Sequence, residues 1–261
     1  MAFPPTRRYH ALTPDNPSRR GAMKTAIITD IHANLEALRA VLDHARDQGA
    51  DEYVCLGDVV GYNADPGPCV DEIRRIPGLR CLLGNHDAMA VGSGPLTGIN
   101  ILAHAAMTWT RAHLDDEQKA WLSGLPLTCE DADAQYSHAS LEDPAAWRYV
   151  NTALDAARHL AYQHARVGFV GHSHVMFAWH DDGDRLDRTT DTEIRLDGDG
   201  RWLVSVGSVG QPRDDNPRAG YAMFDHAART VIQHRIPYDI AEAQRKILAA
   251  GLPPELAHRL G

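Results

Sequence analysis

Three features are scarce in this sequence, and each scarcity excludes a class of protein. No run approaches the roughly 20 consecutive apolar residues that a membrane-spanning helix needs, so we expect a protein that is not inserted in a membrane. Positive charge is in deficit, with 26 Lys and Arg against 35 Asp and Glu and a net charge of −9. Because such a surface repels phosphate-rich polymers on average, general nucleic-acid or membrane-surface binding is not expected, and only a local cationic site is compatible with this charge.

Cysteine is the third scarce feature. The chain contains four, which are Cys55, Cys69, Cys81 and Cys129, and none of them forms a CxxC pair. Cys55 and Cys81 lie inside apolar runs, which predicts small buried side chains rather than a disulfide framework or a thiolate metal site. This usage is typical of a reducing compartment, and we predict a cytoplasmic protein.

The length and composition predict one globular domain. With 261 residues, 44% of them hydrophobic, the chain can bury a sizeable core. Residues 1–22 contain four prolines and four arginines but no apolar run, so we predict a disordered leader, with translation starting naturally at Met23. No linker or repeat interrupts the rest, and we predict a single domain over residues 23–261.

The first half of the chain alternates apolar strands with helices. Strands are predicted over 25–30, 53–57 and 79–84, and amphipathic helices over 34–49 and 66–76. Two successive βαβ units imply a parallel sheet with right-handed crossovers, within an α/β fold.

The second half follows a different pattern. Residues 99–124 predict two helices that form a flank or a cap. A helix over 151–164 precedes a strand over 166–171. Beyond Val175 turn residues become frequent, which predicts an antiparallel meander of short strands before a helical tail.

Polar side chains able to bind metals follow the predicted strands. They are Asp30, His32, Asp58, Asn85, His138, His172 and His174, with His86 and Asp87 beside Asn85. Because ligand sites of open α/β sheets lie outside the carboxyl ends of the strands, we expect five separate loops to meet at one rim.

The residue types at this rim indicate two metal ions. Two carboxylates, one amide and four imidazoles supply oxygen and nitrogen donors without a thiolate, a set that suits manganese, zinc or iron. One tetrahedral zinc ion needs only four ligands. The larger donor set therefore fits two ions that share a carboxylate and keep open positions for water and substrate.

The same residues form motifs that resemble those of the calcineurin-like metallophosphoesterases. The motifs are Asp30-Ile31-His32, Gly57-Asp58-Val59-Val60, Gly84-Asn85-His86-Asp87, His138 and Gly171-His172-Ser173-His174. Within that superfamily, "DIHANLEAL", "CLGDVVGY", "WLSGLP" and "GSVGQPRD" are most similar to the YfcE-like phosphodiesterase branch. The resemblance spans most of the chain from Lys24 to about Asp239. It implies a four-layer αββα sandwich of two facing mixed sheets flanked by helices.

The resemblance also implies a role for each motif residue. One ion would be held by Asp30, His32 and His174 and the other by Asn85, His138 and His172, with Asp58 bridging them. His86 would protonate the leaving oxygen, and Asp87 could orient His86. The implied cofactors are two divalent ions, Mn²⁺ first, with Fe, Zn or Ni as alternatives.

The implied reaction is hydrolysis of a phosphodiester bond in a small or nucleotide substrate, by in-line attack of a hydroxide that bridges the ions. Phosphomonoesterases, protein phosphatases and dinucleoside polyphosphate hydrolases use the same ligands, so the sequence leaves these activities open. A binding scaffold that has lost catalysis is a more remote alternative, which Asn85 and His86 disfavour. The oligomeric state also stays open, a dimer included.

Four further residues are candidate substrate contacts, which are Asn34, Tyr62, Asn100 and Arg213. Arg213 could clamp a phosphate or form a surface salt bridge. Asn34 more simply caps the helix that follows it. For Tyr62 and Asn100, an ordinary role as a loop or cap residue is the simpler interpretation.

Overall fold

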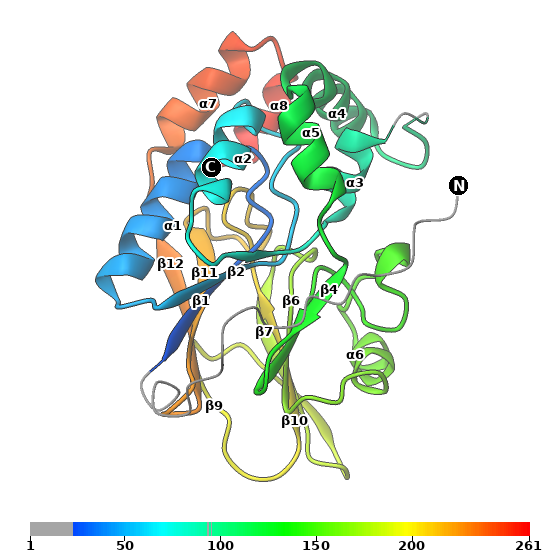
Figure 1. Cartoon of the computed structure of the whole chain (residues 1–261), viewed down its shortest axis with the longest axis vertical. Coiled ribbons are helices and arrows are strands. Elements are labelled where there is room, and N and C mark those ends of the chain that lie inside the picture. Colours follow the sequence, from blue (N-terminus) through cyan, green and yellow to red (C-terminus); the bar gives the residue numbers. More distant parts are fainter. Residues whose placement is uncertain (1–22, 93, 95) are drawn as a thin grey trace.

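Two mixed sheets of six strands each face one another, and helices cover their outer faces (Figure 1). This computed structural model describes residues 23–92, 94 and 96–261. The predicted leader, residues 1–22, lies outside the described residues. The four layers confirm the predicted αββα sandwich.

The first sheet has the strand order β3-β2-β1-β11-β12-β9. Its strands are β1 (Lys24–Ile28), β2 (Glu52–Cys55), β3 (Arg80–Cys81), β9 (Glu193–Arg195), β11 (Ala219–Asp225) and β12 (Thr230–Ile236). β1, β2 and β3 run parallel, as the two predicted βαβ units require, and β11 joins β1 antiparallel. The carboxyl ends of the three parallel strands therefore share one edge of the sheet.

The second sheet has the order β4-β5-β6-β10-β7-β8. Its strands are β4 (Thr128–Glu130), β5 (Ala134–Ser137), β6 (Val167–Val170), β7 (Met176–Asp181), β8 (Leu186–Thr189) and β10 (Arg201–Val206). β5, β6 and β10 are parallel neighbours, whereas β7 is antiparallel to β10. This sheet brings the ends of β5 and β6 to the same rim as the first sheet.

The prediction of one antiparallel meander beyond Val175 is wrong. β7 and β8 form a hairpin in the second sheet, but the chain then crosses to the first sheet, where β9 pairs with β12. It returns to the second sheet as β10, and β11 and β12 form a hairpin back in the first. Alternating hydrophobicity locates strands but not their partners, because pairing depends on side chains far apart in the sequence.

The helices are distributed unequally over the two outer faces (Figure 1). They are α1 (Leu35–Asp47), α2 (Pro66–Arg74), α3 (Asn85–Val91), α4 (Ile101–His113), α5 (Asp116–Ser123), the short 3₁₀ helix η2 (Pro144–Ala146), α6 (Ala153–Leu160), α7 (Ile240–Ala249) and α8 (Pro254–His258). α1 packs on the first sheet, and α6 packs on the second. Apolar residues of α4 form a further cluster with those of α7 and α8.

Side chains alternate along each strand between the inner and outer layers. Ile27 packs between the two sheets with Phe169 and Val204. Its neighbours Ala26 and Ile28 point to the other face and pack under the helices. The core thus holds both sheets rigidly behind the rim where the polar residues lie.

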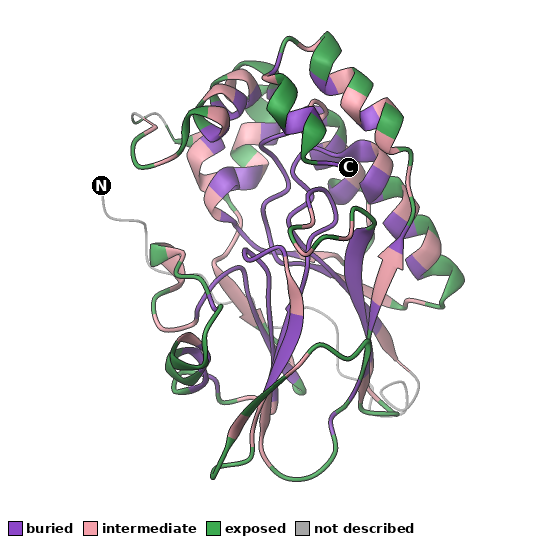
Figure 2. Ribbon diagram, turned by 180° about the vertical axis from the view of Figure 1, so that it is seen from behind, coloured by how far each residue is buried: buried purple, intermediate pink, exposed green. Residues whose placement is uncertain are grey.

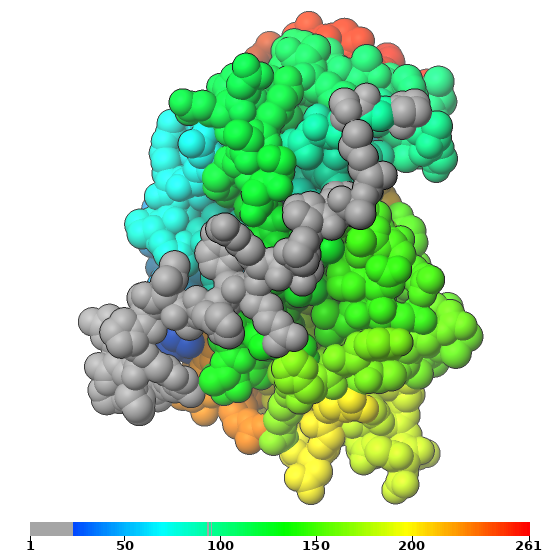
Figure 3. Space-filling view, turned by 45° about the vertical axis from the view of Figure 1, so that its right-hand side comes forward, coloured from blue at the N-terminus to red at the C-terminus, as the bar shows by residue number. Residues whose placement is uncertain are grey.

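The helices α4 and α5 occupy the predicted flank at residues 99–124. They pack against α2 and α3 and form part of the outer surface above the α6 region (Figure 3). α3 itself was not predicted, since the motif Gly84 to Asp87 was expected to be a loop. α3 begins at Asn85, so Asn85 and His86 occupy the first turn of a helix.

The structure also bears on the predictions about membrane-spanning helices and cysteines. No helix in the described part of the chain is long and apolar enough to cross a bilayer. All four cysteines are free, and Cys55 and Cys81 are buried as predicted.

Candidate metal centre

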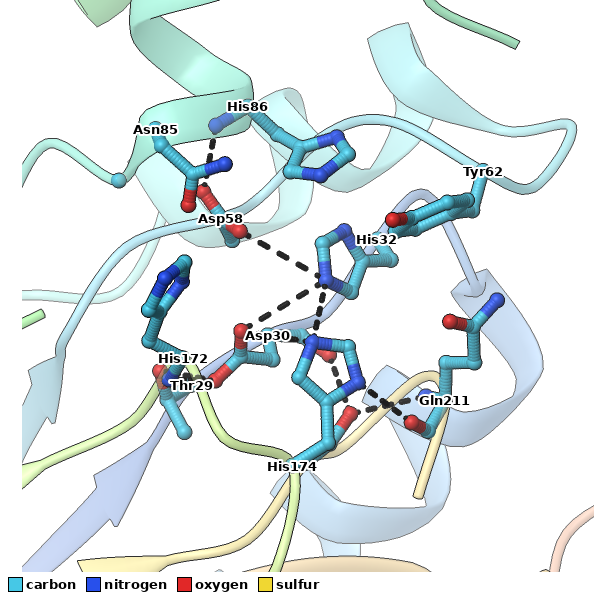
Figure 4. A network of polar contacts seen from close by, with 12 residues as sticks. Thr29, Asp30, His32, Asp58, Tyr62, Asn85, His86, His172, His174 and Gln211 are labelled. Atoms are coloured by element: carbon cyan, nitrogen blue, oxygen red, sulfur yellow. Dashed lines mark hydrogen bonds and ion pairs between the residues drawn. The ribbon is translucent and has the colours of Figure 1, made fainter. Parts of the chain in front are cut away.

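The expected ligands converge where the strand ends of both sheets meet (Figure 4). Asp30 and His32 follow β1, Asp58 follows β2, Asn85 follows β3, His138 follows β5, and His172 and His174 follow β6. The loops that carry them are buried between the helices and the sheets (Figure 2). Six of the seven residues have 7% or less of their surface exposed, and only Asn85 is half-buried.

The backbone of these loops is held in an unfavourable conformation. Five expected ligands have φ between 49° and 65°, which are Asp30, His32, Asp58, His172 and His174. Residues other than glycine rarely adopt this left-handed region, and it is concentrated at functional sites where surrounding structure enforces it. Main-chain hydrogen bonds between the loops do so here, from Asp30 N to Gly57 O and from His32 N to Asp58 O.

Two glycines allow the loops to approach one another closely. A Cβ on Gly84 would lie 2.1 Å from Asp58 Oδ1, and one on Gly171 would lie 2.2 Å from Thr29 Oγ1. Any larger residue at either position would displace a carboxylate or the hydroxyl that supports one. Steric crowding therefore explains why glycine occupies these two motif positions.

The first cluster consists of Asp30, His32 and His174, whose ligand atoms lie within 4.8 Å of one another. Asp30 Oδ1 lies 3.1 Å from His174 Nε2 and 3.6 Å from His32 Nε2. The other carboxylate oxygen, Oδ2, accepts hydrogen bonds from Thr29 Oγ1 and His172 N. Oδ1 is left buried without a hydrogen-bond partner.

Main-chain carbonyls fix the tautomer of three histidines. The Nδ1 atoms of His32, His138 and His174 lie 3.2, 3.1 and 2.6 Å from the carbonyl oxygens of Val60, Leu56 and Gln211. A carbonyl can only accept, so each Nδ1 carries a proton and each Nε2 faces the centre, where its unprotonated form can bind a metal. The Nε2 atoms of His32 and His174 are 3.0 Å apart. Two facing lone pairs beside a carboxylate oxygen form a site for a cation.

The second cluster consists of Asp58, His138 and His172, again within 4.8 Å. Asn85 Oδ1 lies 3.2 Å from His138 Nε2 and joins this group. Asp58 Oδ2 lies 3.4 Å from His138 Nε2 and 3.7 Å from His32 Nε2. The Asp58 carboxylate therefore stands between the two clusters, where a shared ligand would be.

The charges within the centre favour a cation. Burial raises the pKa of Asp30 and of Asp58, but nearby histidines outweigh burial, and both pKa values lie below the ordinary range. Burial lowers the pKa of His138, but Asp58 and Asp30 raise it to about 9. A proton on His138 thus compensates buried negative charge when no metal is bound. The residues fit a pair of divalent ions, whose positive charge would replace that proton.

His86 lies beside both clusters. Its ring is 4.8 Å from the ring of His32 and 4.6 Å from that of Tyr62. One ring nitrogen also comes within 4.8 Å of ligand atoms of His32 and Asp58. The Nδ1 atom of His86 is buried without a hydrogen-bond partner. Burial lowers the pKa of His86 to about 3, so its imidazole is neutral in the metal-free protein.

The Asp87 carboxylate bonds to the main chain instead of to His86. It accepts hydrogen bonds from the backbone N–H groups of Asp58, Val60 and Gly84. Asp87 therefore supports the loop that carries Asp58. An orienting contact with His86, the expected role, is not among its hydrogen bonds.

Two of the four candidate substrate contacts lie at the centre. Arg213 donates through Nη2 to Gln211 Oε1 at 3.1 Å and to the hydroxyl of Tyr62 at 3.5 Å. Its backbone N–H donates to His174 O. The Tyr62 ring lies 4.8 Å from the His32 ring. A guanidinium is thus placed next to the first cluster.

The two asparagines have structural contacts. Asn34 Oδ1 caps α1 by accepting from Ala37 N, and its Nδ2 donates to Gly210 O. Asn100 Oδ1 caps α4 by accepting from Ala103 N. The capping predicted for Asn34 is confirmed, and both polar atoms of its side-chain amide are bonded within the fold.

Three residues near the centre were not singled out from the sequence. Thr29 supports Asp30, and Gln211 both anchors His174 and contacts Arg213. Tyr149 stacks on His172. Thr29 and Gln211 adjoin recognised motifs, which was an available signal, whereas no motif points to Tyr149.

Known proteins share this architecture. A family model described as a calcineurin-like phosphoesterase superfamily domain matches residues 23–229. The uncharacterized protein MJ0912 of Methanocaldococcus jannaschii is 38% identical over 242 residues, which are 90% of this chain and 96% of that protein. The crystal structure of a metallophosphoesterase from Sphaerobacter thermophilus is 37% identical, with a TM-score of 0.82 over 92% of this chain and 98% of that one. The hypothetical protein PH1004 from Pyrococcus horikoshii OT3, at 19% identity, shares the fold with a TM-score of 0.74 over 91% of this chain and 97% of its own.

The family model covers most of the chain, and the buried clusters of histidine and aspartate lie within the matched range. Two relatives agree over nearly their whole length at more than a third identity. The chain therefore belongs to the calcineurin-like phosphoesterase superfamily, a family of metal-dependent phosphoester hydrolases.

Proposed function

We propose that this protein is a dinuclear metal-dependent phosphodiesterase acting on a small or nucleotide substrate. The position of the Asp58 carboxylate carries the proposal, because Oδ2 lies between His32 of one cluster and His138 of the other. One ion would be held by Asp30, His32 and His174. The other would be held by Asn85, His138 and His172, with Asp58 shared.

The bound ions would supply the chemistry that the side chains lack. Two divalent ions activate water and neutralise the phosphate oxygens on which negative charge develops. Their charge of about +4 exceeds the about −2 of Asp30 and Asp58, so an acidic protein can still attract an anion here. The donor set contains no thiolate, which supports manganese as the native metal, with iron, zinc or nickel as alternatives.

His86 is the proposed proton donor to the leaving oxygen. Its imidazole is neutral in the free protein, and a phosphate anion placed beside it would raise its pKa and favour the protonated form. Tyr62 packs against the His86 ring, with the ring centroids 4.6 Å apart. Arg213 is proposed to contact a phosphate oxygen from the side of the first cluster.

The charge of the rim supports a diester over a monoester. Arg213 is the guanidinium that the contacts place beside the clusters, and it already donates to Gln211 and Tyr62. A phosphodiester carries a single negative charge, whereas a monoester becomes a dianion near neutral pH and requires more compensation. The resemblance to the YfcE-like phosphodiesterase branch also supports a diester substrate.

The free cysteines support a reducing, cytoplasmic location.

A substrate panel with manganese tests this function. We expect bis(4-nitrophenyl) phosphate or a 2′,3′-cyclic nucleotide to give a kcat/KM at least about tenfold above that of 4-nitrophenyl phosphate, a difference of about 1.4 kcal/mol in transition-state stabilisation. Faster turnover of the monoester than of every diester would identify a phosphatase instead. Preferential cleavage of diadenosine tetraphosphate would identify a dinucleoside polyphosphate hydrolase. Absence of bound metal and of all activity would support the scaffold alternative.

A further inference from the structure

The loop between β5 and α6, residues 140–150, brings two aromatic rings to the second metal cluster. The Tyr149 ring stacks on the imidazole of His172, with centroids 4.0 Å apart and planes inclined by 18°. The Trp147 ring lies edge-on to His138, with centroids 5.9 Å apart. Each ring therefore adjoins a different ligand of the same expected ion.

The loop holds these rings in fixed positions. Ser140 N donates to Arg148 O, and an ion pair of 2.7 Å joins Arg148 to Glu142. Leu141 N donates to the buried ring of His159, which ties the loop to α6. Trp147 has φ of +54°, a conformation that a bulky residue adopts only when its surroundings enforce it. The loop is thus preformed, and a ligand would not have to order it.

The contacts of Tyr149 leave a large part of its ring free. Tyr149 is 47% exposed although its ring lies against His172, an expected metal ligand that is 7% exposed. Because one face of the ring packs on His172, a ligand that stacks on Tyr149 would use the opposite face.

We propose that Tyr149, with Trp147 beside it, is a stacking subsite for a nucleobase of the substrate. The subsite adjoins His172 and His138, two residues expected to hold the second ion. This inference rests on the proposed function and specifies the organic part of its substrate. Tyrosine suits the task because it offers a large flat surface with few rotatable bonds, and every base has a face that can stack on it.

Binding of reaction products to the manganese-loaded protein tests the subsite without turnover. Adenosine 5′-monophosphate and glycerol 3-phosphate both carry a phosphomonoester, but only the nucleotide has a ribose and a base. Calorimetry gives the Kd of each. We expect Tyr149→Ala to weaken binding of the nucleotide about tenfold, since loss of one base stack costs about 1–3 kcal/mol. Binding of glycerol 3-phosphate and the manganese content should stay unchanged.

Two matched variants separate stacking from structure. Tyr149→Phe keeps the ring and should keep the nucleotide affinity, and Tyr162→Ala removes a tyrosine of 58% exposure that follows α6 and should have no effect. Equal loss of both phosphates or loss of manganese would show that Tyr149 only supports His172. An unchanged nucleotide affinity would also overturn the inference. Failure to cleave any diester would overturn the proposed function alone, because the binding comparison needs no diester hydrolysis.

Discussion

Asp58→Asn is expected to remove bound metal and activity together. Asp58 Oδ2 lies near a histidine of each cluster, so neutralising this carboxylate weakens both ion sites at once. We expect kcat/KM for the preferred diester to fall about 10³-fold or more, because metal stabilisation of the transition state contributes several kcal/mol. Metal analysis of the purified variant, together with its kcat/KM, provides the measurement.

The fold should survive this change. Asparagine keeps the shape of aspartate, and its oxygen can still accept the hydrogen bond from His86 N that Asp58 Oδ1 accepts. The control is Asp71→Asn, the same substitution at a partly exposed position of α2 that pairs with Arg74, and it should match the parent. Retention of both metals with full activity in Asp58→Asn would contradict the bridging role.

His86→Ala is expected to keep the metals and slow turnover. If His86 donates the proton to the leaving oxygen, its loss should lower kcat by about 10²–10⁴-fold. The reduction should be larger for an alkyl or nucleoside leaving group than for nitrophenolate, because a more basic leaving oxygen depends more on protonation. Comparing kcat for two diesters that differ in leaving group measures this dependence.

The position of His86 makes its metal content informative. The ring lies close enough to His32 and Asp58 to act as a ligand itself. Loss of a metal ion in His86→Ala would show that it binds metal and would contradict its assignment as a proton donor. His104→Ala, at an exposed position of α4, controls for the removal of a histidine as such.

Much of the centre was predictable because each ligand stands at the end of an apolar strand. Parallel strands bring their carboxyl ends to one edge, so the order of Asp30, Asp58 and Asn85 along the chain already indicated that they meet. The resemblance of the five motifs to those of the family then predicted which ligands belong together. The structure brings Asp30, His32 and His174 together in one cluster and Asp58, His138 and His172 in another, while their roles as ligands stay a prediction.

Other features depend on contacts that no local pattern encodes. β9 and β10 follow one another but lie in different sheets, because each finds its partner among distant strands. α3 begins within a motif that reads as a loop, and Asp87 bonds to three backbone groups that come from two loops. Tyr149 reaches His172 only through the folding of an irregular loop. The contacts of such residues can be identified only from the three-dimensional structure.

We propose that this chain holds two metal ions bridged by Asp58. A crystal structure of the manganese-loaded protein, with anomalous diffraction at the manganese edge, tests it most directly. We predict two anomalous peaks about 3.5–4 Å apart, one at Asp30, His32 and His174 and one at Asn85, His138 and His172. A single peak, or a peak coordinated by His32, Asp58 and His86, would contradict the assignment.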